Sequence, residues 1–239
     1  MALDEALMAR ARRTGETILR VYGWSAPTLS LGRNQRARDV YRRDLLARRG
    51  IAVVRRPTGG RALLHHREVT YSVAAPCSAD EPLLSAYGAI NSLLVKALAT
   101  LGVPVVVAEP AERASGPTAS PCFAEPVRGE LTIAGRKLVA SAQWRDSGAL
   151  LQHGSILIDD DQSSIPELML DPIAAPSPAT LRDALGRAPV MAEVADALHD
   201  AVRGSVDRDA TPLELDDRLL RDTVRMAERY RDDAWTWRR

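Results

Sequence analysis

The sequence predicts an α+β fold in which helices pack on a mixed or antiparallel β-sheet core. Segments that alternate apolar and polar residues predict strands, and they recur over roughly the first 160 residues. Helical periodicity separates some of these segments and dominates the rest of the chain. Strands joined by turns, with helices packed on the sheet, are typical of α+β domains. The chain has 239 residues, 46% of them hydrophobic, which is enough to bury a sizeable core.

The first half of the chain alternates between the two kinds of segment. Residues 2–13 place apolar and charged positions at helical spacing and predict an amphipathic helix. Two more helices are predicted at residues 39–49 and 83–101, where Gly50 and Gly102 act as stop signals. The strands predicted in this half are residues 17–22, 28–31, 51–56, 69–75 and 103–107.

The second half begins with a long segment that has no periodic pattern. Residues 110–126 are rich in Ala, Pro and Ser, and a loop of this length in a compact domain is usually functional or disordered. Antiparallel strands are then predicted at residues 130–133, 137–143 and 149–157, with a hairpin turn at 134–136. The helices predicted after Asp159 are residues 163–169, 180–185, 189–202 and 213–231.

Charge and cysteine content exclude several classes of protein. Lys and Arg (32) nearly balance Asp and Glu (31), so no global field draws the chain to nucleic acid or to a membrane. No apolar window approaches the length of a membrane-spanning helix. Two cysteines, Cys77 and Cys122, favour a reducing cytoplasm over a disulfide scaffold, although a single bridge between them stays open. We therefore expect a cytoplasmic protein with no nucleic-acid or membrane partner.

The sequence contains no pattern for a metal or nucleotide site. Its four His and two Cys are scattered without the spacing of zinc ligands. It also lacks a Walker-type phosphate loop. We therefore expect no metal and no cofactor.

The most informative segment is residues 55–61, Arg-Arg-Pro-Thr-Gly-Gly-Arg, which leads through His65 into an apolar strand. Adjacent glycines let backbone N–H groups approach a ligand closely, because no Cβ stands in the way. The arginines can neutralise or orient a polar head group. The pattern fits a loop that holds a small ligand by its carbonyl or phosphate end. The alternative is an ordinary glycine turn with solvated arginines.

Two further motifs follow in order. Lys137 lies in a Gly135-Arg136-Lys137 hairpin, and His153-Gly154 comes after it. Together with the arginine–glycine loop, they resemble the lipoate/octanoate attachment family of the biotin/lipoyl protein ligase superfamily, over about residues 1–160. The resemblance implies the catalytic fold that biotin and lipoate protein ligases share with class II synthetases.

The resemblance also implies a domain organisation. We expect a catalytic domain over residues 1–170 and a C-terminal helical segment, residues 171–239, packed on the same domain. Relatives typically carry a strand before the first helix, so we expect either that this edge strand is absent or that the true start lies upstream.

By the same resemblance, Cys122 is the candidate nucleophile and Lys137 its catalytic partner. The Cys122-Phe123 context resembles the octanoyltransferase branch, in which a loop Cys accepts the acyl group and the hairpin Lys lowers the thiol pKa. An ordinary thiol is mostly protonated at neutral pH, and a neighbouring ammonium favours the thiolate. Strand alternation places Arg136 and Lys137 on opposite faces, and the resemblance assigns the inward face to Lys137. Lys137 is also expected to donate to the thioester carbonyl as negative charge builds on its oxygen.

The remaining candidates are expected to bind substrate. They are Arg56, Thr58, Gly59, Gly60, Arg61, His65, Ser141, His153 and Gly154. The two glycines are expected to supply backbone contacts, and the two arginines to shape the mouth of an acyl-binding tunnel or to dock a carrier. For the two histidines, a proton-carrying role and a structural role both stay open.

The function that follows from the resemblance is octanoyl transfer. Octanoate would move from octanoyl-acyl carrier protein to a Cys thioester, and then to a lysine of a lipoyl domain of 2-oxoacid dehydrogenases or of the glycine-cleavage H protein. One alternative is an ATP-dependent lipoate–protein ligase, which would not need the Cys. The other is a non-catalytic acyl-binding protein.

Overall fold

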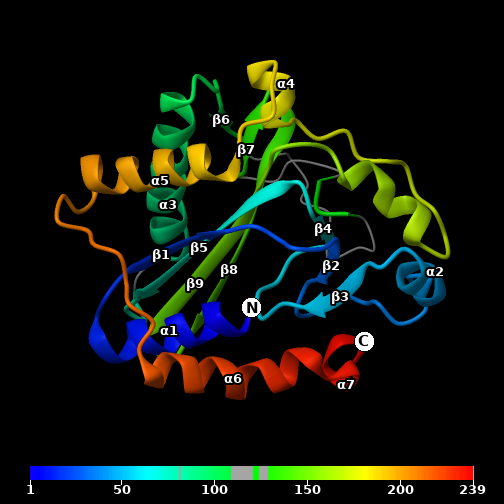
Figure 1. Ribbon diagram of the computed structural model, residues 1–239, viewed down its shortest axis with the longest axis horizontal. Helices are drawn as coiled ribbons and strands as arrows, with labels where there is room; N and C mark the ends of the chain where they lie inside the picture. The colour runs from blue at the N-terminus through cyan, green and yellow to red at the C-terminus, as the bar shows by residue number, and fades with distance from the viewer. Residues whose placement is uncertain (81, 109–120, 124–128, 239) are drawn as a thin grey trace.

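Two β-sheets organise the computed structural model, which describes residues 1–80, 82–108, 121–123 and 129–238 (Figure 1). The larger sheet has six strands in the order β1-β5-β9-β8-β7-β6, and every neighbouring pair is antiparallel. Its strands are β1 (Ile18–Tyr22), β5 (Glu68–Pro76), β6 (Val106–Val107), β7 (Leu131–Ile133), β8 (Arg136–Asp146) and β9 (Ala149–Leu157). The turn at Ala134 and Gly135 has φ angles of 48° and 75°, as a tight hairpin requires.

The smaller sheet carries the arginine–glycine loop. Its central strand β2 (Thr28–Leu31) pairs in parallel with β3 (Ala52–Arg55) and antiparallel with β4 (Leu63–His65). Helix α2 (Arg43–Arg48) and the 3₁₀ helix η1 (Gln162–Leu168) pack on it through a shared apolar cluster. The loop between β3 and β4 is therefore held at both ends by strands that share β2 as a neighbour.

Helices cover both faces of the larger sheet. Helices α3 (Leu83–Thr100) and α5 (Met191–Ser205) share an apolar cluster with β5, β8 and β9 that includes Leu150. Helices α1 (Ala2–Thr14) and α6 (Asp217–Arg231) share a second cluster, which includes Leu151. Because successive side chains of a strand point to opposite faces, the two clusters lie on opposite sides of the sheet. This explains why nearly every residue of β5 and β9 is buried, polar residues included.

The predicted class, an α+β fold with a mixed and antiparallel sheet core, is confirmed. Several boundaries were wrong. The helix expected at 39–49 begins only at Arg43, because Asp39 has a φ of 58° and Tyr41 bridges to Met169. The strand expected at 103–107 is confined to β6. Strand β4 and the short helices α4 (Leu181–Leu185) and α7 (Asp233–Thr236) complete the described elements.

The long loop expected at residues 110–126 lies outside the described residues, except for 121–123. In the described part of the chain, no helix combines the length and the apolar character needed to cross a bilayer. Over the same residues, no group of three or more His, Cys, Asp or Glu side chains is placed to hold a metal ion.

Candidate active site

Arg55, the last residue of β3, has a structural role rather than a ligand-binding role. Its side chain is 0% exposed. Nη1 donates to the carbonyl oxygens of Gly32 at 2.6 Å and Gln35 at 2.8 Å, and Nε donates to the carbonyl of Thr236 at 2.9 Å. Arg55 therefore fixes the loop after β2 and the end of α7 against the smaller sheet.

Arg56 is also buried and organises the glycine loop itself. Its Nη1 donates to Ser30 Oγ at 3.0 Å, while Nη2 donates to the carbonyls of Gly59 at 2.8 Å and Arg61 at 2.7 Å. Burial lowers the pKa of Arg56, yet a guanidinium keeps its charge in proteins. The loop is thus wrapped around a buried cation, and the expected role of Arg56 at the mouth of an acyl tunnel stays a prediction.

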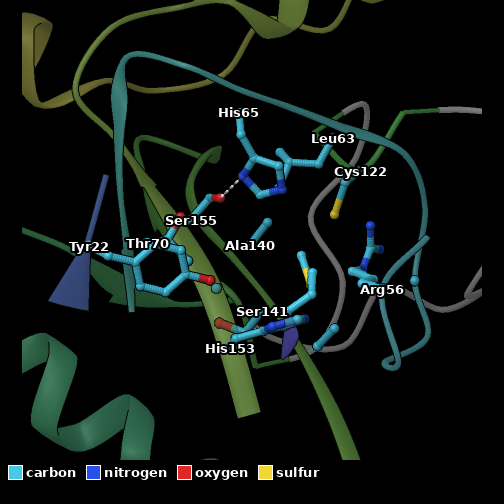
Figure 2. A pocket seen from close by; sticks show the side chains of 14 residues that line it. Tyr22, Arg56, Leu63, His65, Thr70, Cys122, Ala140, Ser141, His153 and Ser155 are labelled. Carbon is cyan, nitrogen blue, oxygen red and sulfur yellow. Dashed lines mark hydrogen bonds between the residues drawn. The ribbon is translucent and has the colours of Figure 1, made fainter. Parts of the chain in front are cut away.

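A narrow cavity lies beside this loop (Figure 2). Its volume is about 30 Å³, which is room for about one water molecule. Seven of the candidate residues line it: Arg56, Gly60, His65, Cys122, Ser141, His153 and Gly154. The other candidates, Thr58, Gly59, Arg61 and Lys137, are not part of the lining and contact residues that are. The structure therefore gathers side chains from four separate sequence segments around one space.

Lys137 is positioned to act on the backbone of Cys122. The lysine side chain is 2% exposed, and Nζ donates a short hydrogen bond to the Cys122 carbonyl oxygen. The Cys122 N–H donates to the carbonyl of Ala62 at 2.8 Å, so the residue is fixed from both sides. The neighbouring Arg136 is exposed and donates to the carbonyl of Pro178 at 3.1 Å. The two hairpin cations thus point in opposite directions, as strand alternation predicts.

The charge state of the thiol differs from the one expected. Burial raises the pKa of Cys122 above its ordinary value, and the carboxylate of Glu130 raises it further. The ammonium of Lys137 acts in the expected direction and lowers the pKa, but it is paired with Glu130 at 2.6 Å. The expectation of a thiol ionised at rest was therefore wrong: desolvation outweighs the neighbouring cation.

Both ring nitrogens of His65 have partners inside the protein. Nδ1 lies 2.7 Å from Glu68 Oε1, and Nε2 lies 2.8 Å from Ser30 Oγ. Arg56 can only donate, so Ser30 Oγ accepts from it and can pass its own hydrogen to Nε2. The imidazole also stacks on Trp24, with centroids 4.1 Å apart. In this arrangement both ring nitrogens of His65 are paired with protein groups, so neither is available to a ligand in the cavity. This favours a structural role for His65.

His153 is held neutral. Its Nε2 lies 2.6 Å from Thr58 Oγ1, which connects β9 to the glycine loop. Burial lowers the pKa of His153 to about 3, although the carboxylate of Asp4 opposes this shift. A group with so low a pKa takes up no proton near neutral pH.

This burial predicts an acid-sensitive fold. An unfolded His titrates near 6.5, so between about pH 6.5 and 3 the unfolded chain binds a proton that folded His153 does not. We expect His153 alone to make the free energy of unfolding fall by about 1.4 kcal/mol per pH unit as the pH drops below about 6.5. Urea unfolding at pH 7 and pH 5 should show a smaller fall in His153→Gln. The exposed His199→Gln should keep the wild-type fall; equal falls in all three proteins contradict the prediction.

Sequence reasoning missed the polar groups that support the lining. Tyr71 OH lies 2.6 Å from Ser141 Oγ, and Glu68 Oε1 accepts from Ser155 Oγ at 2.7 Å. Glu130 holds Lys137. Only the two glutamates carried a signal, because each lies at the start of a strand-like segment of alternating apolar residues and a buried carboxylate needs a partner.

Comparisons with known proteins show the family of the chain. The family model of the lipoyl protein ligase A/B catalytic domain matches residues 1–203. Octanoyltransferase LipM of Kyrpidia tusciae is 38% identical over 100% of this chain and 94% of that protein. Octanoyltransferase LipM of Bacillus subtilis is 31% identical over 100% of this chain and 93% of that protein.

Solved structures share the fold. Lipoate-protein ligase A bound with ATP superposes with a TM-score of 0.81 at 22% identity, covering 99% of this chain and 92% of that one. The bipartite lipoate protein ligase of Thermoplasma acidophilum gives a TM-score of 0.79 at 21% identity, covering 99% and 89%. With the family model matching most of its length, the chain belongs to the lipoyl protein ligase A/B catalytic domain family.

Proposed function

We propose that this protein is an octanoyltransferase that works through a thioester on Cys122. The observation that carries the proposal is that Cys122 lines the cavity while Lys137 and Ala62 hold its main chain in place. The full-length relatives named octanoyltransferase support the same reaction. The candidate residues take the roles set out above, with Cys122 as nucleophile and Lys137 as its cationic partner.

The reaction has two steps. In the first, the Cys122 sulfur attacks the carbonyl of an octanoyl thioester; the new C–S bond forms, the donor C–S bond breaks, and the Cys122 proton ends on the released donor thiol. In the second, a neutral lysine amine of the acceptor attacks the octanoyl-Cys122 carbonyl. An amide forms, the enzyme C–S bond breaks, and an amine proton returns to the sulfur. Lys137 lies close enough to Cys122 to stabilise negative charge in both steps.

The proposed donor is octanoyl-acyl carrier protein, and the proposed acceptor is a lysine of a lipoyl domain or of the glycine-cleavage H protein, in the cytoplasm. The cavity of about 30 Å³ is far smaller than the few hundred Å³ of an ordinary ligand pocket. Binding an eight-carbon chain therefore requires the lining to move apart.

A specific observation favours one other candidate. Because lipoate-protein ligase A shares the fold and was solved with ATP, an ATP-dependent ligase fits the same scaffold. That reaction activates the free acid and has no need of a thiol.

Intact-protein mass spectrometry tests the proposal. After incubation with octanoyl-acyl carrier protein and no ATP, we expect a mass increase of one octanoyl group, which peptide mapping assigns to Cys122. Addition of a lipoyl domain should remove this group and octanoylate the domain. An unmodified thiol together with turnover of octanoate and ATP would establish the ligase instead, and octanoate binding without any acylation would indicate a non-catalytic protein.

A further inference from the structure

Glu130 is the one carboxylate that directly contacts the catalytic lysine among the described residues. It lies immediately before β7 and is 4% exposed. Its Oε2 lies 2.6 Å from Lys137 Nζ, and both side chains are almost fully buried. A buried ion pair gives little net stability because both charges lose their hydration. Its presence beside the nucleophile therefore points to a role in the chemistry.

The pair determines where the ammonium points. Lys137 has three N–H donors. One is directed at Glu130 and one at the carbonyl oxygen of Cys122, so two of the three are already used. The Phe123 ring lies 5.7 Å from Nζ and closes another side. In this arrangement the lysine holds the backbone of the nucleophile, and its ammonium stays close to Cys122.

The charges around the sulfur are unevenly distributed. The guanidinium groups of Arg56 and Arg61, from the glycine loop, and the ammonium of Lys137, from β8, favour a thiolate. Glu130 opposes it. Glu130 also acts on the phenols of Tyr71 on β5 and Tyr87 on α3. Burial raises the pKa of both, so they stay neutral.

We propose that Glu130 is a positioning residue: it holds Lys137 on the backbone of Cys122, and its own negative charge offsets that of the ammonium beside the sulfur. The inference rests on the proposed function only in taking Cys122 as the nucleophile. Its consequence for the reaction is an enzyme that rests with a protonated, weakly reactive sulfur. Lys137 is meanwhile already in place to stabilise the thiolate once the donor thioester arrives.

The test measures the pH dependence of Cys122 alkylation by iodoacetamide, without any acyl donor, in a Cys77→Ser background so that one thiol reacts. In Glu130→Gln, the amide can still accept from Lys137 but carries no charge. We expect the midpoint of the alkylation profile to fall by about one pH unit, the size of shift that a nearby charge produces in a buried site. One unit gives about tenfold more thiolate at pH 7, offset about threefold by its weaker nucleophilicity, so the rate should rise about threefold.

Glu130→Asp is the matched control. It keeps the carboxylate, so its midpoint should stay near that of the parent protein. If a substitution at position 130 only loosened the site, Glu130→Gln and Glu130→Asp would both change the alkylation rate, and neither would move the midpoint of the pH profile. An unchanged or higher midpoint in Glu130→Gln overturns the inference.

A second comparison covers the case in which Glu130→Gln does not fold. The double variant Glu130→Gln/Lys137→Gln removes both charges of the buried pair together, which avoids an uncompensated charge. Its midpoint should lie below that of Lys137→Gln alone, and equal midpoints count against Glu130. Failure of the proposed function would be seen separately, as the absence of an octanoyl group on Cys122 after incubation with octanoyl-acyl carrier protein. The alkylation profile uses no acyl donor, so it can still be interpreted in that case.

Discussion

Replacing Cys122 by alanine is expected to lower octanoyl transfer from the carrier to a lipoyl domain by about 1,000-fold or more. The reason is chemical: without the sulfur no thioester can form, and the remaining groups can only hold the two substrates. The loss should appear in kcat rather than in KM, because the sulfur changes its bonding only during reaction. Octanoylation of the acceptor, followed by mass spectrometry, measures the effect.

Cys77→Ala is the matched control for this variant. Cys77 is also half-buried, but it follows β5 and packs against the apolar cluster of α3 and α5, away from the cavity lining. Its removal should leave transfer intact. If Cys122→Ala retains modification of a lipoyl domain and requires ATP for it, the protein is a ligase. Lys137→Ala does not distinguish the two enzymes, since this cation is expected to serve both reactions.

The parts of the site that the sequence predicts are those governed by local pattern. The hairpin at Ala134 and Gly135 follows from turn chemistry, and the alternation after it places Arg136 and Lys137 on opposite faces. The glycine loop is likewise recognisable because three arginines and a glycine pair lie together within residues 55–61. These features depend on residues that are close in the chain, so they can be predicted without knowledge of the tertiary fold.

The parts that could not be predicted depend on long-range packing. The pairing of Glu130 with Lys137 depends on the register of β7 against β8, which shifts between Leu131 and Thr132. The protonation state of Cys122 depends on how far the fold excludes water from the thiol, and the spacing of residues in the sequence does not reveal this. The sequence therefore predicted which residues lie together better than it predicted their protonation.

Gly32→Ala is expected to damage both stability and catalysis, although Gly32 is not among the predicted site residues. A Cβ at this position would lie 1.9 Å from the carbonyl oxygen of Gly60 and 2.8 Å from its carbonyl carbon. Both of these atoms belong to the backbone of Gly60, and hydrogen bonds to other residues hold the two segments in this contact. Arg55 holds the Gly32 carbonyl at 2.6 Å, and the Arg33 N–H donates to the Thr58 carbonyl at 2.8 Å. The glycine loop must therefore move as a unit.

The expected cost is about 1–3 kcal/mol of unfolding free energy, the usual range for an overpacked site. Because Gly60 lines the cavity with Cys122, we also expect acylation of Cys122 to slow at least about tenfold, as small misplacements of catalytic loops do. Urea unfolding and the rate of octanoyl-Cys122 formation measure the two effects. Gly88→Ala, in helix α3 with open space around its Cβ, is the control and should stabilise the protein slightly. A Gly32→Ala protein that matches it in both measurements would show that the two loops are not in rigid contact.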